Sequence, residues 1–417
     1  MSKKLKILFL VPSFPTVSET FIVNQIIELI DRGHEINIFA TEKKVLEKIN
    51  TNIRDYSLID KTIYANIPSN PIKRIAKAFT LLRKSKHKRK LLKTLNITKH
   101  GIAALTLSTF YKVAWLYNSD DDYQVVHAHF GFMSDYYFNA KVIGFFKKSK
   151  LVTTFHGYDI HPGETEINKI RYKQLLESRY PITVNTIYTK NLILKVNQNF
   201  KNIHISPVSL DTNFFKPKKR IRTDQDKINI LFCGRIITFK GASRIPQIAN
   251  VLVNKKEHKN VSFNIVGNSD EKNDSELNKL KNDIEKYNLE DSVHLLGSKT
   301  QNELIDILNT TDIYIMPGIT DTNGRAENQG LVIQEAQAME IPVIVTSAGG
   351  MQYGLIDGET GYVVDQNSNI DFADKIEILL KDNELRQQMS LAARQFVIKN
   401  YDSKYIINQL EAIYYNQ

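Results

Sequence analysis

The chain has 417 residues, of which 42% are hydrophobic and 10% aromatic, and a formal net charge of +11. This length exceeds what one ordinary hydrophobic core accommodates, so it predicts two domains. No apolar stretch reaches the roughly 18 residues of a membrane-spanning helix, and the single cysteine, Cys233, excludes an internal disulfide. We therefore expect a cytoplasmic protein in which Cys233 is a plain core thiol.

The N-terminal part alternates strand-like and helix-like stretches. Residues 5–11 form an apolar run, residues 21–32 have apolar side chains at helical spacing, and residues 35–40 are strand-like again. Further strand-like runs lie at 124–129, 150–156 and 181–185. This alternation predicts a parallel sheet that is covered by helices on both faces.

The positive charge is concentrated in residues 61–100, which contain twelve Lys or Arg and no Asp or Glu. Without these twelve the chain carries −1, so the basicity belongs to one surface. An apolar stripe runs between the cations along a predicted helix; it consists of Ile72, Ile75, Phe79 and Leu82. The cations assigned to this surface are Lys73, Arg74, Lys77, Arg83, Lys84, Lys86, Lys88, Arg89 and Lys90.

This basic stretch has three readings. Sparse aromatic residues and the lack of a recognition motif argue against a nucleic-acid partner. A mixture of cations and apolar side chains favours binding to an anionic membrane surface, on the inner face of the plasma membrane. Each cation near such a surface contributes about 1 kcal/mol of binding free energy. A solvated helix face is the alternative, and it is about as common.

A second series of strands follows a polar segment. Residues 211–227 are charged and contain Pro217, and we interpret them as the linker. Strand-like runs then recur at 228–234, 261–266, 293–296, 312–316 and 342–346. From residue 371 onwards only helical patterns remain, so we predict that the last helix packs back on the first domain. The predicted units are residues 1–210, 211–395 and 396–417.

Doubly wound sheets bind ligands outside the carboxyl ends of their strands. Arg235 and Lys240 follow the strand that ends at Gly234. An Arg fork and a Lys point charge together suit a diphosphate, although two solvated loop cations are the commoner outcome for such a pair alone. In the first domain, Thr16 and Glu19 have the spacing of a helix capping box, which predicts a helix start at the same edge.

Glu327 and Glu335 lie eight positions apart, between the last two strand-like runs. If both residues were helical, they would be about 12 Å apart along the helix axis. A retaining hydrolase needs its two carboxylates at about 5 Å, so we expect a clamp on one elongated ligand that is rich in hydroxyls. Backbone N–H groups between the two residues would offer an anion site at a helix start. For Glu335 alone, a solvent-facing position is the alternative.

Several histidines and aspartates are candidate metal ligands. His156 ends a strand and can donate to a ligand hydroxyl, and a purely structural histidine is nearly as common. For His127 and His129 we expect side chains on opposite faces of one strand, which leaves no metal site. Residues 120–122 are three aspartates that precede their strand, and we interpret them as a solvated turn at the wrong end of the sheet.

Together these motifs resemble retaining glycosyltransferases of family four, which have the α/β two-domain GT-B fold. The resemblance covers essentially the whole chain and is most specific at residues 327–350. The pieces 18–21, 32–34, 127–131 and 154–159 are similar to the bacterial exopolysaccharide branch that assembles colanic acid and amylovoran. The resemblance implies two facing Rossmann-like, doubly wound domains and a C-terminal helix that crosses back to the first.

The resemblance also implies an activity. Such enzymes transfer a sugar from a nucleotide-diphosphate sugar to a glycan or lipid-linked acceptor in cell-surface polysaccharide synthesis, with retention of anomeric configuration. They need no metal cofactor, because two cations neutralise the leaving diphosphate. Two alternatives stay open: a sugar phosphorylase on the same fold, and a non-catalytic protein that binds sugar nucleotides.

The resemblance assigns roles to individual residues. Arg235 and Lys240 would hold the diphosphate as it leaves, Glu327 the sugar hydroxyls and Glu335 the ribose. His156 would reach the sugar from the first domain. The further residues expected at the donor are Gly234, Lys299, Gln329, Gly330 and Leu331, with Thr16 and Ser18 in the phosphate loop of the first domain.

Overall fold

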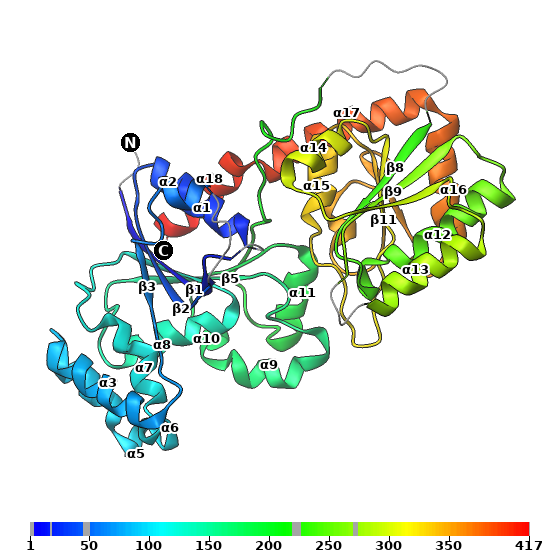
Figure 1. The fold of residues 1–417 in the computed structure, drawn as a ribbon. Helices are drawn as coiled ribbons and strands as arrows, with labels where there is room; N and C mark the ends of the chain where they lie inside the picture. Colours follow the sequence, from blue (N-terminus) through cyan, green and yellow to red (C-terminus); the bar gives the residue numbers. More distant parts are fainter. Residues whose placement is uncertain (1–3, 17–18, 45–50, 219–226, 270–273, 417) are drawn as a thin grey trace.

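The protein consists of two parallel sheets, each packed between helices (Figure 1). The structure is a computed structural model that describes residues 4–16, 19–44, 51–218, 227–269 and 274–416. The first sheet is built before residue 206 and the second after residue 227. The predicted pair of doubly wound α/β domains is therefore confirmed.

The first sheet has the order β3-β2-β1-β4-β5-β6-β7. Its strands are β1 (Lys6–Phe14), β2 (Glu35–Lys43), β3 (Thr62–Tyr64), β4 (Val125–His129), β5 (Lys150–Phe155), β6 (Ile182–Val184) and β7 (Ile203–Ile205). The helices of this part are α1 (Thr20–Asp31), α2 (Thr51–Asp55), α3 (Pro71–Lys84), α4 (Lys88–Leu92), α5 (Ile97–His100), α6 (Ile102–Leu105), α7 (Ser108–Val113), α8 (Ser134–Val142), α9 (Thr165–Arg171), α10 (Lys173–Glu177) and α11 (Ile187–Val196).

The second sheet has the order β10-β9-β8-β11-β12-β13. Its strands are β8 (Ile228–Cys233), β9 (Val261–Val266), β10 (Val293–Gly297), β11 (Ile313–Met316), β12 (Val343–Thr346) and β13 (Gly361–Val364). The helices that follow the linker are α12 (Ile245–Ala249), α13 (Asp274–Lys286), α14 (Gln301–Leu308), α15 (Leu331–Ala338), α16 (Asn369–Lys381), α17 (Asn383–Tyr401) and α18 (Ser403–Tyr415).

The strand order of each sheet reverses direction at one point. In the first sheet this point lies between β1 and β4, and in the second between β8 and β11. A crevice opens at such a switch point, outside the carboxyl ends of the strands. The fold therefore places the end of β1 and the end of β8 where each domain can bind a ligand.

The centres of both sheets are buried on both faces. Ile7, Leu8, Phe9 and Leu10 in β1 are all fully buried. Burial on both faces explains why residues 5–11 form an unbroken apolar run instead of an alternating pattern. It also allows the sequence to predict the central strands.

Three strands were not predicted from the sequence, namely β3, β7 and β13. Each of them is an edge strand of three or four residues. An edge strand bonds to a neighbour on one side only, so it needs no long apolar run to be stable in place. Local sequence is therefore a weak guide to these elements.

The C-terminal helix returns to the first domain, as predicted. In Figure 1, α18 lies beside α1, and its Leu410 and Tyr414 belong to the same buried cluster as Ile26 of α1. The chain crosses between the domains twice, at Leu210 and near Asp402. The two crossings are bonded to each other, because Leu210 N–H donates to the Tyr401 oxygen at 3.0 Å.

Motifs at residues 32–34 anchor this returning helix. The carboxylate of Glu411 accepts from Arg32 Nη1 at 2.6 Å and lies 2.7 Å from His34 Nε2. His34 Nδ1 accepts from the backbone N–H of Leu5 at 3.1 Å, so the neutral ring donates through Nε2. The Arg-Gly-His motif therefore has a structural role here.

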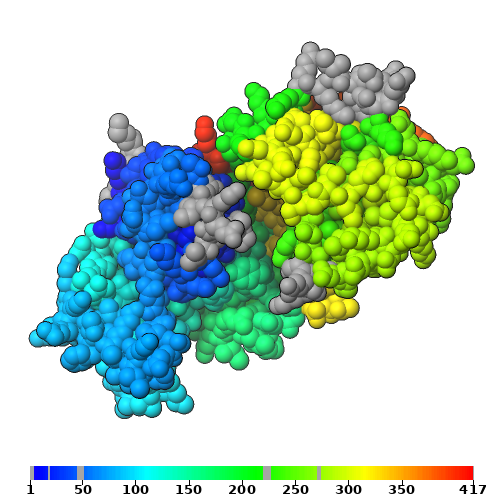
Figure 2. Space-filling view, in the orientation of Figure 1, coloured from blue at the N-terminus to red at the C-terminus, as the bar shows by residue number. Residues whose placement is uncertain are grey.

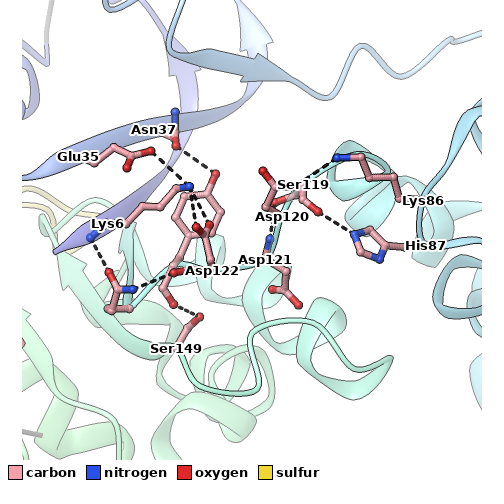
Figure 3. Close-up of polar contacts among 12 residues, drawn as sticks. Lys6, Glu35, Asn37, Lys86, His87, Ser119, Asp120, Asp121, Asp122 and Ser149 are labelled. Carbon is pink, nitrogen blue, oxygen red and sulfur yellow. Dashed lines mark hydrogen bonds and ion pairs between the residues drawn. The ribbon is translucent and has the colours of Figure 1, made fainter.

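The three aspartates at residues 120–122 lie at the amino end of the first sheet, away from the switch point (Figure 3). Asp122 pairs with Lys6 of β1 at 2.8 Å, and Asp120 pairs with Lys86 at 3.2 Å. Asp121 has a side chain that is only 13% exposed and accepts from the N–H of Phe146 at 2.8 Å. The predicted solvated turn is thus wrong for Asp121, whose side chain is mostly buried and contacts Lys90 and the backbone of Phe146.

Candidate functional site

The end of β8 carries two of the predicted cations. The chain turns at Gly234, and Lys240 ends a short 3-10 turn that precedes Gly241. Gly241 has φ +76°, and a Cβ there would overlap the backbone oxygen of Pro317 after β11. Glycine is therefore required for the turn to pack against the neighbouring strand end.

Lys240 forms an ion pair with Glu327, with 2.8 Å between Nζ and Oε2. Both side chains are 15% exposed. Burial alone would raise the pKa of Glu327, but Lys240 beside it outweighs burial and holds the pKa below its usual value, with help from the N–H of Asn328 and from Arg235. Glu327 is therefore an ionised hydrogen-bond acceptor at neutral pH.

Arg235 differs from Lys240 in its surroundings. Its side chain is exposed at the same strand end and forms no ion pair with any described residue. One cation is thus already paired with a carboxylate, and the other is available to an anion. Two cations at the end of one strand, beside the switch point of the sheet, suit a phosphate-bearing ligand.

Glu327 does not lie on a helix, so the separation expected for two helical glutamates was wrong. It belongs to the irregular loop before α15, and the helix starts after Gly330, which has φ +69°. The axial separation of two helical residues therefore does not apply to Glu327 and Glu335. They reach the site from a loop and from a helix, respectively.

Glu335 is buried on α15, so the solvent-facing alternative is wrong. Its side chain lines a cavity of about 330 Å³ between the domains, together with Leu331 and with Phe21 and Asn24 of α1. Burial raises the pKa of Glu335 to about 7. A carboxyl group that changes charge near neutral pH faces a space that both domains enclose.

The other predicted donor residues of the second domain have different surroundings. The side chain of Gln329 is 5% exposed and is bonded to Val208 rather than open to the cavity. No side chain caps the start of α15 at Gly330 and Leu331. Lys299 lies 3.8 Å from Glu303, on the connection before α14, whose first residue Gln301 lines the cavity.

In the first domain, His127 and His129 lie on the same face of β4, not on opposite faces. Their ring centroids are 4.3 Å apart. The expectation was wrong because side chains alternate with every residue, so positions two apart share a face. His127 is bonded to Tyr414 and Thr154 at 2.7 and 2.6 Å, so it is a structural residue.

His156 is stacked on His129, with 3.1 Å between His156 Nε2 and His129 Nδ1. Burial lowers the pKa of His156 to about 3, so the ring is neutral. His156 Nδ1 and His129 Nε2 are buried without a hydrogen-bond partner. Nδ1 is therefore the ring atom of His156 that is left for a ligand or a water molecule.

A residue that the sequence did not single out holds His156 in place. The carboxylate of Asp159 accepts from the backbone N–H groups of His156, Gly157 and Gly131 at 3.0, 2.9 and 2.7 Å. Burial raises the pKa of Asp159 to about 6, against the lowering effect of these bonds. The spacing of an aspartate three residues after the histidine was the available signal.

The first loop differs from the prediction. Helix α1 begins at Thr20, and Glu19 precedes it without a side-chain cap, so the predicted capping box is absent. Thr16 Oγ1 donates instead to the Glu19 carboxylate at 3.2 Å. Ser18 lies outside the described residues. Burial raises the pKa of Glu19, which lies beside the exposed ring of Tyr158.

Three further expectations concern metal ligands, membrane-spanning helices and the single cysteine. Among the described residues, no three His, Cys, Asp or Glu side chains are placed to hold a metal ion. In the same part of the chain, no helix has the length and apolarity to cross a membrane. Cys233 is buried, as expected for a core thiol, and burial raises its pKa to about 12.

The chain is similar to known glycosyltransferases in sequence. Residues 213–396 match the family described as Glycosyl transferases group 1. The putative colanic acid biosynthesis glycosyltransferase WcaL of Salmonella typhimurium is 26% identical, over 98% of this chain and 99% of its own. The amylovoran biosynthesis glycosyltransferase AmsK of Erwinia amylovora is 25% identical, over 83% and 84%. The predicted similarity to this branch is therefore confirmed.

A solved structure shows the same fold. Alr3699/HepE of Anabaena, in complex with UDP, superimposes with a TM-score of 0.71 at 14% identity, over 99% of this chain and 100% of its own. At this level of identity the likeness concerns the fold alone. The predicted GT-B arrangement of two facing Rossmann-like domains is confirmed.

Proposed function

We propose, from the group 1 glycosyl transferase domain that residues 213–396 form, that the protein transfers a sugar from a nucleotide-diphosphate sugar to a glycan or lipid-linked acceptor. The observation that carries the proposal is the Lys240–Glu327 pair with Arg235 unpaired beside it. Similarity along nearly the whole chain to a colanic acid glycosyltransferase supports a role in cell-surface polysaccharide synthesis.

The donor would extend from the end of β8 to the cavity between the domains, which Glu335 lines. Arg235 and Lys240 would neutralise the diphosphate, and Glu335, at the wall of the cavity, would accept from the ribose hydroxyls. Glu327 would accept from hydroxyls of the transferred sugar. UDP is the first nucleotide to test, because a protein of the same fold was solved with UDP bound.

Transfer would proceed with retention of anomeric configuration. The bond between the anomeric carbon and the diphosphate oxygen breaks, and the acceptor oxygen bonds to the same face of that carbon. The acceptor proton passes to the leaving phosphate oxygen, so no protein base is required. The two cations would stabilise the charge that develops on the diphosphate, and no metal ion would be needed.

A thermal-shift panel of UDP-, GDP-, ADP- and CDP-sugars tests the donor, since a ligand of the folded state stabilises it by mass action. We expect stabilisation by one nucleotide class, release of that nucleotide in the presence of acceptor glycans, and equal rates with and without EDTA. NMR of the product would show the retained anomer. Stabilisation by inorganic phosphate and by no nucleotide would identify a phosphorylase, and binding without turnover a non-catalytic protein.

We also propose that helix α3 and its neighbours bind an anionic membrane surface. Ile72, Ile75 and Phe79 are 78%, 64% and 69% exposed, and cations of the predicted basic surface lie on the same helix, among them Lys73 and Lys77. Leu82, by contrast, packs against the core. Some cations are already paired, such as Lys86 and Lys90 with aspartates, so the free charge is smaller than the sequence implies.

Vesicle flotation tests this surface. We expect native protein to float with vesicles that contain anionic lipid at low salt, and to sediment at high salt or with neutral vesicles. Replacing Ile75 and Phe79 with serine should weaken flotation. Ile170→Ser, which changes an exposed apolar side chain elsewhere in the first domain, serves as the control. Salt-insensitive or absent binding to anionic vesicles would exclude the proposal.

A further inference from the structure

Asn328, in the loop before α15 of the second domain, is bonded to three residues of the first domain. Its Oδ1 accepts from Thr186 Oγ1 at 2.6 Å and from Thr189 Oγ1 at 2.8 Å. Its Nδ2 donates to the backbone oxygen of His156 at 3.3 Å. One carboxamide therefore uses both its acceptor and its donor across the domain boundary.

Glycines on both sides shape the position that Asn328 occupies. A Cβ at Gly157 of the first domain would overlap the Asn328 carboxamide. A Cβ at Gly350 of the second domain would overlap the Asn328 backbone oxygen. Because neither glycine has a side chain, the Asn328 carboxamide packs directly against the backbone of Gly157 in the first domain.

The adjacent residue, Gln329, makes a second contact across the boundary. The N–H of Val208 donates to Gln329 Oε1 at 2.8 Å, and Gln329 Nε2 donates to the Val208 oxygen at 2.8 Å. This two-point bond holds the loop against the segment that follows β7. Two consecutive amide side chains thus fasten one loop of the second domain to the first.

The same loop carries the carboxylate of the proposed sugar site. Glu327 precedes Asn328, accepts from its backbone N–H at 3.1 Å, and pairs with Lys240. In the first domain, the backbone oxygen of His156 accepts a hydrogen bond from Asn328 Nδ2. The backbone N–H of His156 donates to the Asp159 carboxylate. Asn328 therefore joins the Glu327–Lys240 pair to the peptide group of His156.

We propose that Asn328 is a positioning residue of the transfer reaction, and that its carboxamide sets the separation between His156 and the Glu327–Lys240 pair. The reaction itself rests on the proposed function; the contact across the domains does not. Loss of the carboxamide lets the two domains separate while Arg235 and Lys240 stay in place on the second domain. Transfer should then slow much more than donor binding weakens.

The test compares Asn328→Ala with Asn323→Ala, an exposed asparagine in the preceding turn. Full-length protein without ligand is measured by small-angle X-ray scattering, and kcat and KM are measured with the nucleotide sugar that proves active. For Asn328→Ala we expect a larger radius of gyration and a donor KM within about threefold of native. We expect a kcat about 10- to 1,000-fold lower, because the three hydrogen bonds to Thr186, Thr189 and His156 are lost. Asn323→Ala should match native protein in all three.

A second pair of variants guards against a folding defect. Thr186→Val removes a hydroxyl that donates to Asn328 and also caps α11 through the N–H of Thr189, and Thr186→Ser keeps both contacts. We expect a kcat about 3- to 10-fold lower for the valine variant, as for one lost hydrogen bond, and native kcat for the serine variant. A merely structural role for Asn328 would change melting temperature without this split between kcat and KM.

Three outcomes would overturn the proposal: a native radius of gyration in Asn328→Ala, a donor KM that rises as much as kcat falls, or an equal loss in Asn323→Ala. If native protein transfers no sugar at all, the proposed function fails. Scattering then decides the proposal by itself, because an unchanged radius of gyration shows that Asn328 does not set the separation of the domains.

Discussion

Lys240 and Glu327 are paired at 2.8 Å although they come from two different connections of the second sheet, one after β8 and one after β11. The pairing keeps the half-buried Glu327 carboxylate ionised beside the Lys240 ammonium. In the proposed function each residue exchanges part of this contact for the donor, the lysine for a phosphate oxygen and the glutamate for a sugar hydroxyl.

The first prediction concerns this pair. Lys240→Met should lower kcat about 100-fold or more, because a cation at the leaving group is lost. It should also cost about 1–3 kcal/mol of unfolding free energy, since the Glu327 carboxylate loses its partner. Enzyme kinetics and thermal unfolding measure both effects.

The double variant Lys240→Met/Glu327→Gln separates the two effects. It should recover stability, because no unpaired charge remains, but not activity. Lys279→Met, an exposed lysine on α13, is the control and should behave as native protein. Full activity in Lys240→Met would remove this residue from the diphosphate site.

The second prediction concerns pH and Glu335. Burial raises its pKa to about 7 in the folded protein, whereas an unfolded chain titrates near 4.3. Its contribution to stability is fully present below the unfolded pKa and is lost as the pH rises through the folded pKa, because the folded state then must release a proton that it binds more tightly. Glu335→Gln removes this dependence.

The stability of Glu335→Gln relative to native protein should therefore increase by roughly 3 kcal/mol between about pH 4.5 and pH 7.5. Urea unfolding across this pH range measures the difference. Glu359→Gln, an exposed glutamate after α15, should give a curve parallel to that of native protein. Parallel curves for Glu335→Gln as well would show that Glu335 titrates normally.

The third prediction concerns Asp159. A carboxamide has one acceptor oxygen, so Asp159→Asn cannot accept from His156, Gly157 and Gly131 together. We expect a loss of about 1–3 kcal/mol in unfolding free energy and a lower kcat, because the loop that carries His156 moves. Asp371→Asn, an exposed carboxylate on α16, is the matched control; equal melting temperatures for the two variants would contradict this role.

The fourth prediction concerns the returning helix. Leu410 of α18 is 1% exposed in the core of the first domain, so Leu410→Ala should cost about 2–5 kcal/mol. Tyr405→Ala, on the exposed side of the same helix, should cost far less. Calorimetry should show that Leu410→Ala destabilises the first domain; a melting curve that matches that of Tyr405→Ala would mean that α18 adds little to it.

Most of the fold could be predicted from the sequence, since long apolar runs such as residues 5–11 and 228–233 can hardly be anything but buried strands. The candidate cations Arg235 and Lys240 could also be found from the sequence, because they lie in a short segment, directly after a predicted strand, that glycines flank. The edge strands β3, β7 and β13 were not, because their stability comes from a neighbour rather than from their own residues.

The amino-acid sequence by itself determined which residues could be buried, where the chain turns and which charged groups lie at strand ends, because these properties depend on local periodicity and on residue chemistry. Only the tertiary structure decided that Glu335 is buried, that Glu327 forms an ion pair with Lys240, and that Asn328 is hydrogen-bonded to the first domain. These are contacts between residues far apart in the chain. Their geometry depends on how two separately folded sheets face each other, which no local pattern encodes.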